Sequence, residues 1–121
     1  MPRSLLVYLT DIVAACDAVE RYLAGADVSS YRADDLVRSA VERQLILIGE
    51  AVGSLLRARP DVSVRISHAR RIVDFRNQLT HNYAAIDDAV VWSIATSEVP
   101  VLRQECRVLL AEFEAERETA D

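Results

Sequence analysis

The 121-residue sequence has few of the residues that break or cross-link a polypeptide chain. It contains three glycines, three prolines and two cysteines, and all 14 basic residues are arginine. Scarce glycine and proline favour a few long secondary-structure elements. No stretch is apolar for long enough to span a membrane, and the N-terminus has no apolar core of a signal peptide. We therefore expect a cytoplasmic protein.

The two cysteines, Cys16 and Cys106, lie far apart and form no Cys-x-x-Cys pair. Isolated cysteines in a reducing compartment usually serve as small buried apolar residues. The histidines, cysteines and acidic residues also lack the spacing of metal ligands. We therefore expect no metal site, no redox centre and no bound cofactor.

Apolar residues make up 51% of the sequence, enough for a packed core, and 121 residues suit a single domain, residues 1–121. A chain of this size would gain stability by forming a dimer. In residues 3–24 apolar side chains recur at alternating steps of four and three, the pattern of a helix in a bundle. These side chains are Leu5, Leu9, Ile12, Cys16, Val19 and Leu23.

A second, longer helix is expected from residue 31 or 33 to residue 58, since Pro60 stops it. Short polar residues that can cap a helix or favour its N-terminus lie near its start: Ser29, Ser30, Asp34 and Asp35. Gly49 and Gly53 lie four residues apart inside this helix, and each costs about 1 kcal/mol relative to alanine. We infer that another helix approaches closely here, either within the bundle or across a dimer.

Ser67 can cap a third helix, from residue 68 to residue 79 or 80, and Asp87 can cap a fourth. Pro100 fits only the first turn of a helix or a bend. It therefore either kinks the fourth helix or begins a fifth, which would end near residue 116. No segment has the alternating pattern of a strand. The predicted fold is all-α, an up-down bundle of four or five helices.

The formal net charge of −5 argues against a protein that coats nucleic acid. The charges are unevenly placed, however. Residues 65–76 carry four arginines against one acid, Asp74, and acidic residues gather from residue 112 onward. Arg65, Arg70 and Arg71 either form the solvated face of a helix or contribute to a basic surface.

Polar and ionisable side chains gather in residues 76–83, Arg-Asn-Gln-Leu-Thr-His-Asn-Tyr. On a continuous helix, Arg76, Thr80 and Tyr83 share one stripe, and Asn77 and His81 share the next. Arg76 and His81 would then lie about 140° apart around the helix. They converge only if the helix ends near Thr80, if the arginine reaches across, or if a second copy related by a twofold axis brings both pairs into one groove.

These residue types suit cleavage of RNA without a metal ion. A histidine can exchange protons with a ribose 2′-hydroxyl near neutral pH, an arginine can hold the phosphate, and an asparagine can orient either group. His81, Arg76 and Asn77 would take these roles. The last three residues of the motif also have structural alternatives. His81 can be a cation at a helix C-terminus, Asn82 the left-handed residue that ends the helix, and Tyr83 a core residue.

Three blocks of the sequence resemble the HepT-like ribonucleases, a branch of the HEPN superfamily. They are Arg-Asn-x-Leu-x-His-x-Tyr at 76–83, Ile-Gly-Glu-Ala at 48–51, and Val-Trp at 91–92 after Ile-Asp at 86–87. At 67–68 the chain has Ser-His where family members often have Pro-Trp. The resemblance covers nearly the whole chain and implies a HEPN-like helical bundle that forms a homodimer.

The resemblance also implies an activity and a partner. It implies a ribonuclease toxin that cleaves RNA in a groove at the dimer interface and is paired with a small nucleotidyltransferase antitoxin of the MntA type. On this basis Arg76 and His81 would be the catalytic pair, with Asn77 supporting them. Tyr83 would be the residue to which the antitoxin attaches AMP from ATP.

Several residues outside the motif also have expected places. Arg70 and Arg71, in the basic zone beside the motif, are candidate contacts to RNA phosphates. Glu50 is expected to be a buried carboxylate paired with an arginine, and His68 a surface or packing residue. The alternative function is a non-catalytic helical module that binds a nucleotide or a nucleotidyltransferase partner. A third possibility is a purely structural helical dimer.

Overall fold

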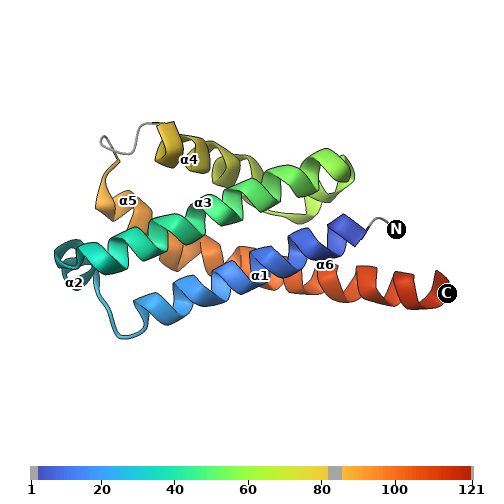
Figure 1. Ribbon diagram of the computed structural model, residues 1–121, viewed down its shortest axis with the longest axis horizontal. Coiled ribbons are helices and arrows are strands. Elements are labelled where there is room, and N and C mark those ends of the chain that lie inside the picture. Colours follow the sequence, from blue (N-terminus) through green and yellow to red (C-terminus); the bar gives the residue numbers. More distant parts are fainter. Residues whose placement is uncertain (1–2, 82–85, 121) are drawn as a thin grey trace.

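The structure is a computed structural model that describes residues 3–81 and 86–120, and every regular element in this part of the chain is helical. Four long helical runs alternate in direction, and α1 begins at the same end of the bundle where α6 ends (Figure 1). The predicted all-α, HEPN-like bundle is confirmed. Its elements are α1 (Arg3–Leu23), α2 (Val28–Ala33), α3 (Asp35–Ala58), the 3₁₀ helix η1 (Pro60–Arg65), α4 (Ala69–His81), α5 (Asp88–Ser93), the π-helix η3 (Ile94–Glu98) and α6 (Val99–Ala120).

The core forms where α1 packs against α3 and α6. All six apolar residues of the seam predicted for the first helix are buried, and so are both cysteines. Burial raises the pKa of the Cys16 and Cys106 thiols to about 12, so both stay protonated near neutral pH. The prediction that they are buried apolar residues is confirmed.

The expected single helix from residue 31 or 33 to residue 58 is wrong at its start. Asp27 caps the short helix α2 by accepting a hydrogen bond from the Ser30 N–H at 2.8 Å, and the Ser30 hydroxyl accepts one from the Asp27 N–H at 3.0 Å. The chain then leaves the helical conformation at Asp34, whose carboxylate accepts from the Val37 N–H at 3.1 Å and caps α3. The α3 cap is therefore Asp34 and neither of the two expected serines.

The predicted cap of the third helix is also wrong. The Ser67 hydroxyl donates to Glu105 on α6 at 2.6 Å, and the Ser67 N–H donates to the same carboxylate. Helix α4 begins two residues later, at Ala69, and includes His81. The contact to Glu105 ties the start of α4 to α6.

Backbone helix continues from α5 through η3 into α6, across Pro100. Within η3 the Val99 N–H donates to the carbonyl of Ile94, five residues back, which is the hydrogen bond of a π turn. Proline has no N–H, so a helix that contains it must rearrange in the preceding turn. The structure has one continuous helical run here, with a π turn just before Pro100, and no break that separates a new helix from the preceding one. None of the described helices is long and apolar enough to cross a membrane.

Candidate active site

Arg76 lies on α4 where this helix packs against α3. The backbone of Gly49, on α3, faces the stem of the arginine side chain. A Cβ atom added at Gly49 would lie 2.2 Å from the Arg76 Cβ and 2.6 Å from its Cγ, closer than real carbon atoms approach. The absence of a side chain at Gly49 therefore makes room for Arg76. The close approach expected at this face occurs within the bundle.

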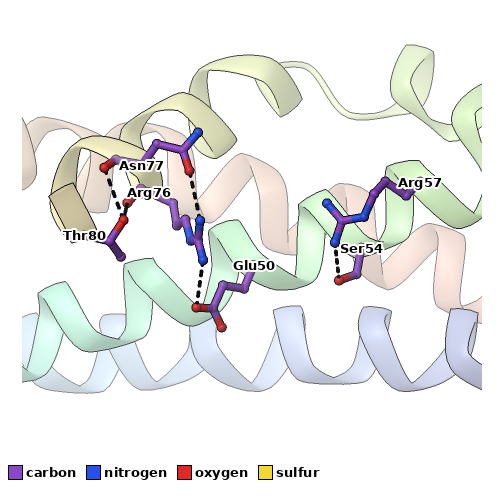
Figure 2. Close-up of polar contacts among 6 residues, drawn as sticks. All are labelled: Glu50, Ser54, Arg57, Arg76, Asn77 and Thr80. Carbon is purple, nitrogen blue, oxygen red and sulfur yellow. Dashed lines mark hydrogen bonds and ion pairs between the residues drawn. The ribbon is translucent and has the colours of Figure 1, made fainter.

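Two acceptors hold the Arg76 guanidinium (Figure 2). Nη2 donates to the Glu50 Oε1 at 3.1 Å, and Nη1 donates to the Asn77 Oδ1 at 2.9 Å. The Arg76 Nε–H is buried and has no hydrogen-bond partner among the described residues. The predicted pairing of Glu50 with an arginine is correct, but its side chain is 48% exposed and not buried.

Thr80, one turn after Arg76 on α4, does not contact the Arg76 guanidinium. Its hydroxyl donates to the backbone carbonyls of Arg76, at 3.1 Å, and Asn77, at 3.2 Å. Such hydrogen bonds back to the preceding turn are common for threonine in helices. Thr80 therefore supports the backbone that carries Arg76.

His81 is the last residue of α4 and is exposed. Because the helix continues through His81, the 3.6-residue period places it about 140° around the axis from Arg76. Helix α4 ends one residue after Thr80, as one option from the sequence had it, but His81 is still part of the helix, so this end does not bring it to Arg76. No side-chain hydrogen bond or ion pair among the described residues involves His81. The Arg76 guanidinium instead turns to Glu50 on α3, so a single α4 presents the two predicted catalytic residues on different faces.

Arg70 and Arg71 line a different surface. A groove of about 600 Å³ lies between the start of α4 and the α5–η3 run, and both arginines border it together with His68. Glu98, on η3, has a side chain that is only 9% exposed, and its Oε1 lies 3.3 Å from the Arg71 Nε and 3.6 Å from the His68 Nδ1. Arg71 and His68 are thus partners of a buried carboxylate that the sequence did not reveal.

A second cavity, of about 410 Å³, contains the polar groups around Arg76. Its lining combines residues of α3 and α4: Gly49, Glu50, Gly53, Ser54, Arg57, Val73, Arg76 and Asn77. Ser54 and Arg57 were not among the residues predicted from the sequence. The sequence indicated them only by position. Ser54 lies one helical turn after Glu50, and Arg57 lies one turn after Gly53, in the helix that contains the Ile-Gly-Glu-Ala block.

Asn82 and Tyr83 lie outside the described residues, so the predicted cap and the predicted AMP acceptor remain predictions.

Arg65, in the basic zone, forms a two-bonded ion pair with Glu112 at 3.0 and 2.8 Å. Among residues 3–81 and 86–120, no three histidine, cysteine or acidic side chains are grouped so that they could hold a metal ion.

Comparison with known proteins identifies the family. The family model described as "Ribonuclease HepT-like" matches residues 12–109, most of the chain. The chain belongs to the HepT-like ribonuclease family. This HEPN family places the chain among the ribonucleases.

Similar proteins are found in archaea and bacteria. A Methanocaldococcus jannaschii protein provisionally named as an RNase is 25% identical, over 93% of this chain and 96% of that protein. A Thermococcus cleftensis protein named as a probable ribonuclease HepT is 28% identical, over 85% of this chain and 93% of its own length. A Caldanaerobacter subterraneus protein, also provisionally named as an RNase, is 24% identical over 85% of this chain and 91% of its own. No solved structure gives a significant match.

Proposed function

We propose that this protein is a metal-independent endoribonuclease that cleaves RNA with Arg76 and His81. The observation that supports this assignment is the Arg76 guanidinium, which Glu50 and Asn77 orient over a cavity in a chain of the HepT-like family. An arginine held by two acceptors has its fork fixed before a phosphate arrives, so binding costs less conformational entropy. Asn77 is then a positioning residue that acts through Arg76.

The proposed reaction uses the RNA as its own nucleophile. His81 takes the proton of a ribose 2′-hydroxyl, and the 2′ oxygen attacks the neighbouring phosphorus. The bond to the 5′ oxygen of the next nucleotide breaks, and that oxygen takes a proton from an imidazolium. The products are a 2′,3′-cyclic phosphate and a 5′-hydroxyl. Arg76 stabilises the negative charge that builds on the non-bridging phosphate oxygens.

A second copy of the chain completes the site in this proposal. The support is geometric, because one α4 directs Arg76 towards α3 and His81 towards solvent, about 140° away. A twofold axis beside α4 would place both pairs in one groove between the copies. We therefore propose a homodimer with the RNA bound at its interface.

We further propose that the protein acts in the cytoplasm as the toxin of a toxin–antitoxin pair. Its partner is a nucleotidyltransferase of the MntA type that attaches AMP to Tyr83. The tyrosine oxygen attacks the α-phosphorus of ATP, and pyrophosphate leaves. Tyr83 lies two residues after His81 in the sequence, so the added bulk and negative charge would repel an RNA phosphate there.

Intact mass tests this regulation. The protein is purified after expression with the active transferase or with a transferase variant that cannot bind ATP. We expect AMP-sized mass increases on a peptide containing Tyr83 only with the active transferase. Unchanged mass in both samples would contradict regulation by nucleotide transfer.

The alternative, a non-catalytic module that binds a nucleotide or a transferase partner, is favoured by one observation. Glu50 already pairs with Arg76, and such a pair can serve structure alone. RNA cleavage by the purified protein in the presence of EDTA separates the two functions. Cleavage supports the nuclease, and intact RNA together with a stable transferase complex supports the binding module.

The two histidines of the chain provide a matched test of the catalytic role. His81→Ala should lower the rate of RNA cleavage at least about 100-fold, the usual contribution of a general acid or base. His68→Ala should cleave like wild type, because His68 contacts Glu98 in the other groove. Circular dichroism should show equal helicity in both variants. If the two variants cleaved RNA equally well, His81 would not be the catalytic histidine.

A further inference from the structure

Arg57 shares the cavity of Arg76 but belongs to the last turn of α3. Its side chain extends back along α3 towards Glu50 and Arg76, and Nη2 donates to the Ser54 hydroxyl at 3.1 Å (Figure 2). A neutral hydroxyl orients the guanidinium without cancelling its charge. Arg57 therefore presents a directed positive charge to the same cavity.

Two glycines of α3 lie against the side chains of the two arginines, Gly49 against Arg76 and Gly53 against Arg57. A Cβ at Gly49 would collide with the Arg76 stem, and a Cβ at Gly53 would lie 3.4 Å from the Arg57 Nη1. The glycines are four residues apart, so these positions are separated by about 6 Å along α3. Each glycine inside a helix costs about 1 kcal/mol. The bare strip of α3 thus faces the stem of the Arg76 side chain at Gly49 and the guanidinium of Arg57 at Gly53.

The charge of the cavity is positive. Its charged lining residues are two arginines and one glutamate, and the glutamate pairs with Arg76. Among the described residues, no carboxylate lies within ion-pair distance of Arg57. The cavity therefore has positive charge to spare for an anion, and the Arg57 guanidinium is the group that carries it.

The lining also indicates which anion fits. Val73 is the one apolar side chain among the described lining residues, and none of these residues is aromatic. Arginine forks and a hydroxyl are suited to phosphate oxygens. The cavity is therefore suited to the phosphate backbone of a nucleic acid.

We propose that Arg57, oriented by Ser54, binds a phosphodiester group of the RNA strand next to the one held by Arg76. This inference rests on the proposed function, because it assigns Arg76 to the phosphate that is cleaved. Arg57 contributes to substrate binding and register and takes no part in proton transfer. Its loss should raise KM and leave kcat almost unchanged.

The test measures binding without cleavage. A single-stranded RNA oligonucleotide with hydroxyl groups at both ends is titrated into the His81→Ala protein over a series of salt concentrations. Such an RNA offers internal phosphodiesters and no terminal phosphate. Replacing Arg57 by alanine should weaken binding at low salt and reduce the slope of log K against log salt by about 0.7 for each phosphate that the arginine had neutralised.

Two further variants distinguish charge from structure. Arg21→Ala removes one exposed arginine from the last turn of α1, at the end of the bundle away from Arg57, and should leave both affinity and slope unchanged. Arg57→Lys keeps the charge and should retain most of the slope. If Arg57→Ala and Arg21→Ala gave the same affinity and slope, the second phosphate subsite would be wrong.

The same experiment separates this inference from the proposed function. Cleavage by wild type combined with no effect of Arg57→Ala overturns the subsite and leaves the nuclease assignment intact. A reduced slope in Arg57→Ala combined with no cleavage by wild type supports the subsite and overturns the nuclease assignment. Failure of the His81→Ala protein to bind the oligonucleotide at low salt would overturn the subsite.

Discussion

Gly49 and Gly53 are chemically identical residues on one helix, yet their surroundings predict opposite effects of alanine. Alanine in place of glycine favours a helix by about 1 kcal/mol. At Gly49 the new methyl group would overlap the Cβ and Cγ of Arg76, and overpacking of this kind costs about 1–3 kcal/mol. We expect Gly49→Ala to lower the free energy of unfolding by about 1 kcal/mol or more.

Gly53→Ala is the matched control. Its methyl group would meet only the far end of the Arg57 side chain, at 3.4 Å, an ordinary van der Waals contact. We expect the free energy of unfolding to stay equal or to rise by up to about 1 kcal/mol. Urea denaturation at one fixed protein concentration measures both variants. A Gly49→Ala protein as stable as Gly53→Ala would contradict the packing of Arg76 on α3.

Individual site residues differed in how far the sequence could predict them. The motif residues Arg76, Asn77 and His81 stand out because their side chains suit phosphate chemistry. An arginine partner for Glu50 was expected from the sequence, but not that this partner would be Arg76. Glu98 and Arg57 could not be predicted, because the burial of Glu98 depends on a π turn and the setting of Arg57 depends on how α4 packs against α3.

For the helices, the spacing of apolar residues predicted which segments are helical better than it predicted the residue at which each helix begins. The end of α3 at Ala58 and the buried seam of α1 follow from spacing and from Pro60. The segment between α1 and α3 holds several residues that can cap a helix. Only tertiary packing selects among them, since the short helix α2 buries Tyr31 against Trp92, with ring centroids 5.6 Å apart.

The helical run at Pro100 shows the same limit. The sequence allowed either a kink or a new helix, because proline at this point is compatible with both. The observed π turn keeps the run continuous and brings Glu98 under Arg71 and His68. The extra residue of the π turn shifts the register of the helix in a way that apolar spacing and Pro100 alone do not indicate.

In the molecule as a whole, the described residues form the hydrophobic core of the bundle. The two residues of the proposed catalytic pair lie on different faces of α4. Arg76 faces α3 with Glu50 and Asn77, and His81 lies exposed at the helix end. In the proposed dimer, two copies of the chain therefore bring an arginine and a histidine to one RNA phosphate.

Complementation between inactive variants tests this claim most directly. Arg76→Ala and His81→Ala chains are co-expressed with different affinity tags, and the mixed dimer is isolated by purification on both tags in turn. Each chain then supplies the group that the other lacks. If the site is shared, the mixed dimer should cleave RNA at least about 100-fold faster than a dimer of either variant alone, since a general acid–base group is restored. A mixed dimer no more active than the two variant dimers, or chains that fail to pair at all, would contradict a site built from two copies.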